Sequence, residues 1–182
     1  MRIVLASASP RRLELLKACG LDVEVRAADV DERVRPGEPP GEMVLRLAVE
    51  KAKTVPGLEL VVAADTTVVL DGQSLGKPAD AAEATAMIAK LSGRAHDVLT
   101  GFCVKRVSQV RSGVVRTKVV FRALSREEIA AYVATGEPFD KAGGYGIQGL
   151  GGALVDTVQG SYPNVVGLPV REVLAAIREL SP

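Results

Sequence analysis

Hydrophobic and polar positions follow two different periods along the chain, and these periods predict strands and helices in a mixed order. A short apolar run at 3–6 predicts a buried strand, followed by a polar loop and a helix that starts near Pro10 and ends at Gly20. Further apolar or alternating runs predict strands at 21–27, 58–64, 66–70, 96–107, 114–124 and 153–158. Helical spacing predicts helices at 41–54, from Asp80 to Gly93, from Ser125 to Gly136 and at 170–180.

Local signals sharpen several of these boundaries. Asp71-Gly72 predicts a hairpin after the 66–70 strand. Asp80 with Glu83, and Ser125 with Glu128, have the spacing of capping boxes at helix starts. This order of elements predicts an α/β fold with a mixed, partly antiparallel sheet.

Composition narrows the classes of protein that fit. The 182 residues suffice for one domain, 1–182, which could fold as two lobes, and 47% of them are hydrophobic. Lys plus Arg (23) nearly balances Asp plus Glu (22), which argues against general nucleic-acid or membrane binding. Cys19 and Cys103 both lie in apolar stretches, and we expect two buried thiols in a reducing compartment. With no signal peptide or apolar run of membrane-spanning length, the sequence predicts a cytoplasmic protein.

The loop from Ser7 to Arg12 is the first candidate for chemistry. It combines two hydroxyls and two arginines with the start of a helix, whose free N–H groups suit an anion. Arginine can bind phosphate oxygens through two parallel hydrogen bonds. A capped helix with two solvated arginines accounts for these residues equally well.

Three later segments also hold polar residues or glycines that packing does not require. Asp65 follows a buried strand, where it could bind a metal or accept a proton, although a simple turn aspartate has the same pattern. Lys77, in Gly76-Lys77-Pro78, could bind a phosphate through its charge or be an ordinary exposed lysine. Six glycines in the thirteen residues 140–152 predict an ordered binding wall, with a mobile loop as the alternative.

Taken together, these segments resemble the Maf family of nucleoside triphosphate pyrophosphatases over almost the whole chain. The resemblance is carried by Leu5-Ala6-Ser7-Ala8-Ser9-Pro10-Arg11-Arg12, Glu50-Lys51-Ala52, Ala64-Asp65-Thr66, Gly76-Lys77-Pro78, 140–149 and Asn164-Val165-Val166-Gly167-Leu168-Pro169. It implies a long twisted mixed sheet with flanking helices in two lobes around a deep cleft. It also implies a homodimer and a divalent cation, Mg or Mn, that assists the attack of water on a triphosphate.

The resemblance assigns roles position by position. Asp65 matches the family's catalytic proton acceptor, and its role as base, metal ligand or both stays open. Glu32 matches an acidic position near the metal, so Glu32 and Asp65 are the candidate metal ligands. The positions that line the phosphate site are matched by Ser7, Arg12, Lys51 and Lys77.

Three positions separate the substrate groups of this family, and here they are Arg11, Thr66 and Gln148. They match the group that resembles dTTP/UTP pyrophosphatases, whereas the 7-methyl-GTP group tends to carry Trp and Glu in place of Arg11 and Gln148. A glutamine amide has both a donor and an acceptor, so it can pair with the imide edge of uracil or thymine. We therefore expect Arg12 on the phosphates and Arg11 near the base, and modified pyrimidine nucleotides could share the site.

Two other functions remain as alternatives. A nucleotide-binding regulator of cell division fits because family members have been associated with septum inhibition. A 7-methyl-GTP pyrophosphatase is the other choice within the same family. The intact set of Asp65, Lys51 and Lys77 favours catalysis, since a protein that only senses nucleotides need not keep them.

Overall fold

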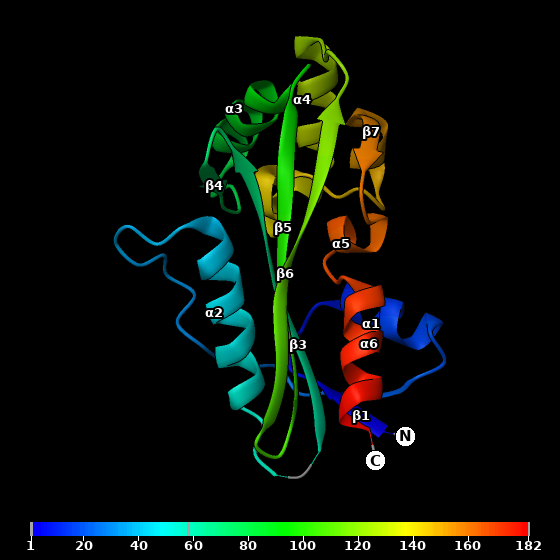
Figure 1. The fold of residues 1–182 in the computed structure, drawn as a ribbon. Coiled ribbons are helices and arrows are strands. Elements are labelled where there is room, and N and C mark those ends of the chain that lie inside the picture. Colours follow the sequence, from blue (N-terminus) through cyan, green and yellow to red (C-terminus); the bar gives the residue numbers. More distant parts are fainter. Residues whose placement is uncertain (1, 58, 182) are drawn as a thin grey trace. The chain divides into compact units, whose positions relative to one another are not determined.

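The computed structural model describes residues 2–57 and 59–181, and Figure 1 shows its helices and strands along the chain. The chain divides into two compact units. The first comprises 1–66, 100–115 and 167–182, and the second comprises 67–99 and 116–166. Three long strands contribute to both units: β3 (Leu60–Leu70), β5 (Ala95–Arg106) and β6 (Gln109–Phe121).

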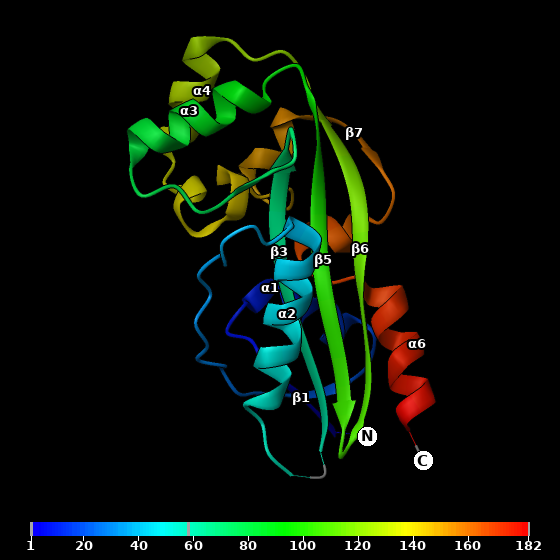
Figure 2. The same ribbon diagram turned by 60° about the vertical axis from the view of Figure 1, so that its left-hand side comes forward.

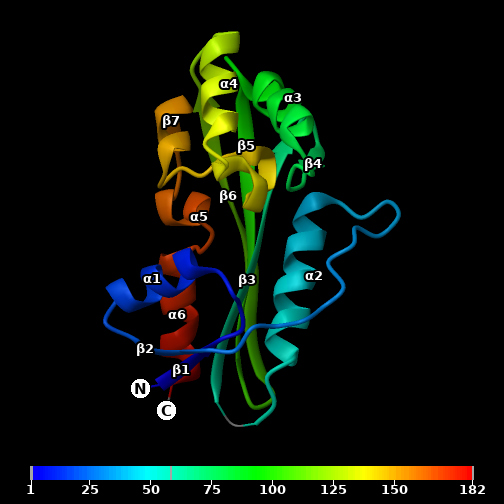
Figure 3. The ribbon, with the colours of Figure 1, turned by 180° about the vertical axis from the view of Figure 1, so that it is seen from behind.

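The first unit places helices on both faces of its strands. Its other elements are β1 (Arg2–Leu5), α1 (Pro10–Ala18), β2 (Asp22–Val25), α2 (Pro40–Lys53) and α6 (Val170–Leu180). Successive strand residues point to opposite faces, so Ile3 and Leu5 join a core with α1 and α6, while Val4 joins a second core with α2. Figures 1 and 3 show α2 on one side of the strands and α6 on the other.

The second unit packs its helices against one hydrophobic core. Its elements are β4 (Gln73–Leu75), α3 (Ala81–Leu91), α4 (Arg126–Ala134), three 3-10 turns (Glu137–Asp140, Ala142–Gly144, Leu150–Leu154), β7 (Val155–Gln159) and α5 (Tyr162–Val166). Helices α3 and α4 lie side by side (Figure 2), and Ile88 and Ile129 enter the core from them. The Ser125 and Glu128 capping box forms at the start of α4 with both of its hydrogen bonds.

Strand pairing gives a mixed sheet of order β2-β1-β3-β5-β6-β7 within the described residues, with β4 paired to β3. Strand β1 is parallel to both β2 and β3. By contrast, β4 is antiparallel to β3, and β7 is antiparallel to β6. The expected α/β fold with a partly antiparallel sheet and flanking helices is confirmed.

Several sequence-based predictions were wrong in detail. The runs 58–64 and 66–70 were expected to be two strands, but they form the single strand β3, so Asp65 lies inside a strand instead of after one; Leu58 lies outside the described residues. The polar pair Asp65-Thr66 does not break the strand because both side chains have hydrogen-bond partners there. Cys103 is buried as expected, whereas Cys19 is exposed because it follows the last turn of α1.

The described helices include none that is both long enough and apolar enough to cross a membrane.

His96, the one histidine in the sequence, is buried in the core of the second unit. Its Nε2 lies 2.7 Å from the Tyr145 hydroxyl, and its ring meets Phe121 and Tyr145 edge to face. Burial outweighs the attraction of Asp97 and lowers the pKa of His96 from 6.5 to about 4. The unfolded chain therefore binds a proton near pH 6 that the folded protein excludes.

We expect His96 to make stability dependent on pH in a defined window. The pKa of His96 is lower in the folded protein than in the unfolded chain. The contribution of neutral, buried His96 to the free energy of unfolding is therefore complete above pH 6.5 and is lost as pH falls toward about 4. Each pKa unit corresponds to about 1.4 kcal/mol, so the free energy of unfolding falls by about 3 kcal/mol across this range. Urea unfolding of the wild type and of His96→Gln between pH 7.5 and 4.5 measures it, and the variant should show the smaller loss. An imidazole resonance that titrates near pH 6.5 by NMR would contradict this assignment.

Candidate active site

Lys51 on α2 is the centre of a small cluster of charges in the first unit. Its side chain is only 8% exposed, and its Nζ lies 2.7 Å from Asp65 Oδ1 on β3 and 2.5 Å from Glu32 Oε1. A buried ammonium is costly unless it is paired and hydrogen-bonded. The two carboxylates supply that pairing, so the structure brings together three of the residues that the sequence predicted for the site.

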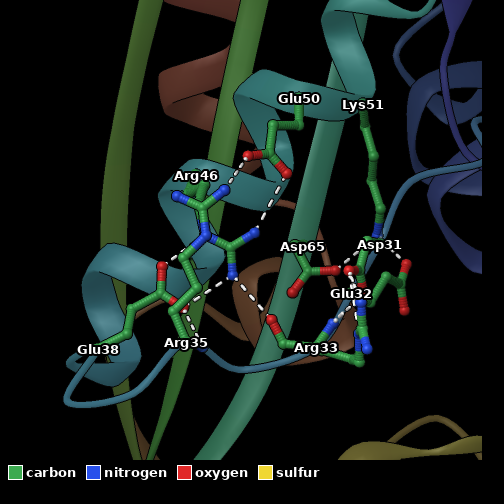
Figure 4. A network of polar contacts seen from close by, with 9 residues as sticks. All are labelled: Asp31, Glu32, Arg33, Arg35, Glu38, Arg46, Glu50, Lys51 and Asp65. Carbon is green, nitrogen blue, oxygen red and sulfur yellow. Dashed lines mark hydrogen bonds and ion pairs between the residues drawn. The ribbon is translucent and has the colours of Figure 1, made fainter.

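Glu32 lies on an irregular segment, 26–39, and an ionic network fastens this segment to α2 (Figure 4). Arg46 is the centre of the network: its Nη2 donates to Glu38 Oε2 at 2.8 Å and to the Arg33 carbonyl at 3.2 Å. Its Nη1 donates to Glu50 at 3.1 Å, and Arg35 donates to the same carboxylate at 3.0 Å. The segment that carries Glu32 is thereby held near Lys51 without secondary structure of its own.

The Arg46–Glu38 pair is the most sheltered part of this network, with side chains 13% and 9% exposed. The Arg46 hydrogen bonds lower the pKa of Glu38 to about 2, in opposition to partial burial. Glu38 therefore remains a carboxylate throughout the neutral and mildly acidic range. Its role was not evident from the sequence, because it depends on the contact with Arg46, which lies eight residues further along the chain.

Arg12 on α1 organises a second set of polar groups in the same unit. Its Nη1 donates to Ser7 Oγ at 3.0 Å and its Nη2 donates to Thr66 Oγ1 at 3.2 Å. Its Nε donates to the Gly167 carbonyl at 2.8 Å. Thr66 also shares a hydrogen bond of 2.9 Å with Thr100, a residue that sequence analysis missed because it lies inside a long β-rich run. The predicted residues Ser7, Arg12 and Thr66 thus form one hydrogen-bonded set.

Burial and nearby charges act on the Arg12 guanidinium, and their net effect lowers its pKa. Burial lowers the pKa of Arg12, the Asp65 charge raises it, and the neighbouring Arg11 lowers it. An arginine stays cationic under these conditions. A guanidinium has five N–H donors, so these three bonds within the described residues use three of the five N–H groups of Arg12.

Strand geometry explains why these residues form two sets. Asp65 and Thr66 are consecutive in β3, and consecutive strand residues point to opposite faces. Asp65 therefore meets Lys51 from α2, while Thr66 meets Arg12 from α1. The Asp65-Thr66 dipeptide therefore joins two sets of residues. We call Lys51, Asp65 and Glu32 the acidic set, and Arg12, Ser7 and Thr66 the arginine set.

Lys77 and Gln148 belong to the second unit, and both are exposed. The turn that carries Lys77 is fastened to the glycine-rich segment, because the Gly143 N–H donates to the Gly76 carbonyl at 2.9 Å. The glycine-rich segment itself is ordered into 3-10 turns around Tyr132 and Glu137. Neither residue stands out in the sequence, where Gly136 indicates only the end of a helix.

The donor chemistry of this site suits a hard divalent cation, which prefers carboxylate oxygens. No group of three or more His, Cys, Asp or Glu side chains is arranged to hold a metal within 2–57 and 59–181. Magnesium commonly uses one or two carboxylates, with water and substrate phosphates completing its shell. Asp65 and Glu32 fit that requirement, since both reach the same Lys51 nitrogen.

We expect Arg46→Met to loosen the segment 26–39. The change removes the hydrogen bonds to Glu38, Glu50 and the Arg33 carbonyl, so the segment opens more often. Trypsin cleavage after Arg33 should accelerate about fivefold if cleavage follows the open population.

Lys53→Met is the matched control, because Lys53 is an exposed cation on the same helix. Equal cleavage rates for Arg46→Met and the wild type would show that the network does not hold the segment.

Comparisons with known proteins identify relatives along nearly the whole chain. A family model described as Maf-like protein matches residues 2–180. A dTTP/UTP pyrophosphatase of Anaeromyxobacter dehalogenans (strain 2CP-C) is 58% identical over 181 residues, which cover 97% of this chain and 93% of the relative. A dTTP/UTP pyrophosphatase of Geotalea uraniireducens (strain Rf4) is 51% identical and covers 98% and 94%.

Among solved structures, the Staphylococcus aureus Ham1 protein covers 66% of this chain and 72% of its own, with 18% identity and a TM-score of 0.44. That likeness is too weak to add to the assignment. The family model and the curated relatives, each spanning nearly the full length, decide it. The chain belongs to the Maf-like protein family.

Proposed function

We propose that this protein hydrolyses dTTP and UTP to the nucleoside monophosphate and pyrophosphate. The observation that carries the proposal is the Asp65-Thr66 dipeptide, which connects a buried lysine–carboxylate cluster to an arginine held by Ser7. Relatives at 58% and 51% identity that carry the name dTTP/UTP pyrophosphatase support the same activity and substrates.

In the proposed reaction, the water oxygen forms a new bond to the α-phosphorus. The bond between the α-phosphorus and the oxygen that bridges to the β-phosphorus breaks. Asp65 takes the proton from the water, and pyrophosphate leaves with the electrons of the broken bond. Lys51 holds the Asp65 carboxylate in place through a hydrogen bond of 2.7 Å.

Phosphate binding falls to Ser7, Arg12, Lys51 and Lys77 in this proposal. Arg12 is oriented by three hydrogen bonds, so little conformational freedom is lost when its remaining donors meet phosphate oxygens. Lys51 is already shared by two carboxylates, and we therefore assign it mainly to Asp65 and Glu32.

We propose a divalent metal, Mg or Mn, as the cofactor, with Asp65 and Glu32 as its protein ligands. Such an ion offsets phosphate charge and lowers the pKa of a bound water. Asp65 and Glu32 would orient the coordination shell of the cation, and Lys51 would balance their negative charge before the cation binds.

Base selection is assigned to Arg11, Thr66 and Gln148. Gln148 is exposed and carries both a donor and an acceptor, as the imide edge of uracil or thymine requires. The Thr66 hydroxyl is held by hydrogen bonds with Arg12 and Thr100.

The proposal includes a homodimer, as the family resemblance implies, and a cytoplasmic location, as the sequence predicts. Two free cysteines, Cys19 and Cys103, suit a reducing compartment. Light scattering coupled to gel filtration tests the oligomeric state directly.

We expect Asp65→Asn to lower pyrophosphate release from UTP about 100- to 10,000-fold, the usual contribution of a general base. Asp71→Asn is the matched control, because Asp71 directly follows the same strand and forms an exposed ion pair with Arg94. A fully active Asp65→Asn enzyme would refute the assigned role. Tight UTP binding without any pyrophosphate release by the wild type would instead favour the alternative function, a nucleotide-binding regulator of cell division.

Gln148→Glu should shift preference away from UTP and dTTP. A carboxylate only accepts hydrogen bonds, so it loses the donor for a pyrimidine carbonyl and suits the two donors of a guanine edge. The ratio of kcat/KM for UTP to that for 7-methyl-GTP should fall about tenfold or more. Gln159→Glu, an exposed change on β7, should leave the ratio unaltered. An unchanged ratio in Gln148→Glu would reject this account of base selection.

A further inference from the structure

The Glu137 carboxylate lies at the centre of the glycine-rich segment in the second unit. Its Oε2 accepts the Leu150 N–H at 2.8 Å, and its Oε1 accepts the Gly151 N–H at 2.9 Å. The Tyr132 hydroxyl donates to the same Oε1 at 2.9 Å and accepts the Gly146 N–H at 3.3 Å. One carboxylate and one phenol therefore tie down both ends of the stretch 146–151.

This stretch contains Gln148 at its middle. Gln148 is exposed, so packing alone does not fix where its amide points. What is fixed is the backbone on either side, through the N–H groups of Gly146 before it and of Leu150 and Gly151 after it. A hydrogen-bonded backbone limits the positions that the amide can sample.

The glycines of this stretch allow the backbone to approach the carboxylate. A Cβ at position 149 would clash with the Glu137 carboxylate, and a Cβ at position 151 would lie 2.7 Å from the Tyr132 hydroxyl. Glu137 cannot simply move aside, because three donors hold it. The glycines and the carboxylate are thus parts of one arrangement.

Electrostatics agree with a permanently charged carboxylate. Partial burial raises the pKa of Glu137, but the N–H groups of Gly151 and Leu150 and the Tyr132 hydroxyl outweigh it and lower the pKa below 4.5. Hydrogen bonds to an ionised acceptor are stronger than those between neutral groups. Both backbone donors therefore remain engaged at neutral pH.

We propose that Glu137 is a positioning residue that holds the stretch 146–151, and with it Gln148, in the conformation that selects the base. This inference rests on the proposed function, because it deepens the role given there to Gln148. Glu137 acts through the backbone and does not itself touch the nucleotide.

Glu137→Gln is the variant that tests it most directly. It keeps the size of the side chain, but its NH₂ group must face one of the two backbone N–H donors. Gly149→Ala offers an independent route to the same defect, since it displaces an intact carboxylate. Glu83→Gln is the matched control, because Glu83 also accepts a backbone N–H in this unit, from Ala79 at 2.8 Å, but at the start of α3.

Amide hydrogen exchange in the nucleotide-free protein gives the first readout. The Leu150 and Gly151 amides should exchange about tenfold faster in Glu137→Gln and in Gly149→Ala, as local opening becomes easier. Glu83→Gln should leave both rates unchanged. Unaltered exchange in Glu137→Gln would overturn the proposal, whatever happens to activity.

Selectivity gives the second readout. In Glu137→Gln, the preference for UTP over CTP in kcat/KM should fall about tenfold, mainly through KM, while kcat for UTP changes less than about threefold. Faster exchange with unaltered selectivity would overturn the link to base selection, and an equal loss for both nucleotides would reduce Glu137 to a structural role.

The proposed function can fail separately from this inference. If the wild type releases no pyrophosphate from UTP or dTTP, the proposed activity is wrong, and calorimetric binding of UTP and CTP replaces the kinetic comparison. Loss of the UTP preference in binding would then still support the role of Glu137, and an unchanged preference would overturn it.

Discussion

The buried ammonium of Lys51 is the constraint on which the rest of the candidate site depends. A charge this sheltered must be neutralised, and the structure meets the requirement with Asp65 from a central strand and Glu32 from an irregular segment. The second partner explains why so many ion pairs surround the segment 26–39. Glu32 can reach Lys51 only if its segment stays against α2, and Arg46 holds it there through Glu38, Glu50 and a backbone carbonyl (Figure 4).

Strand β3 positions the polar residues of the candidate site. Its alternation sends Asp65 toward α2 and Thr66 toward α1, so residues from both faces of the first unit meet at one dipeptide. The hydrophobic residues that precede this dipeptide are buried in cores on the two faces, which anchor the strand beside a polar position. Packing therefore sets the separation between the acidic and the arginine sets.

The second unit solves a different problem, which is how to order a segment with little side-chain surface to bury. Glycine-rich backbone loses much entropy on folding, and its N–H groups need partners. Glu137 and Tyr132 provide those partners from outside the segment. The result is a backbone held by charge and hydrogen bonds, whereas most of the unit is held by an apolar core.

Sequence alone determined the elements whose signals are local, such as the strand–loop–helix opening, the Asp71-Gly72 hairpin and the capping box at Ser125. It also determined the family, because several short motifs occur in the right order. It could not determine that β3 is continuous, since a polar pair in an apolar run looks like a strand end until its partners are known. The positioning roles of Arg46, Thr100 and Glu137 were equally hidden, because each depends on contacts with residues distant in the chain or on the folded path of a loop. Only tertiary structure decides such contacts, because a charge or hydroxyl acquires its role from the groups that folding brings within hydrogen-bond distance.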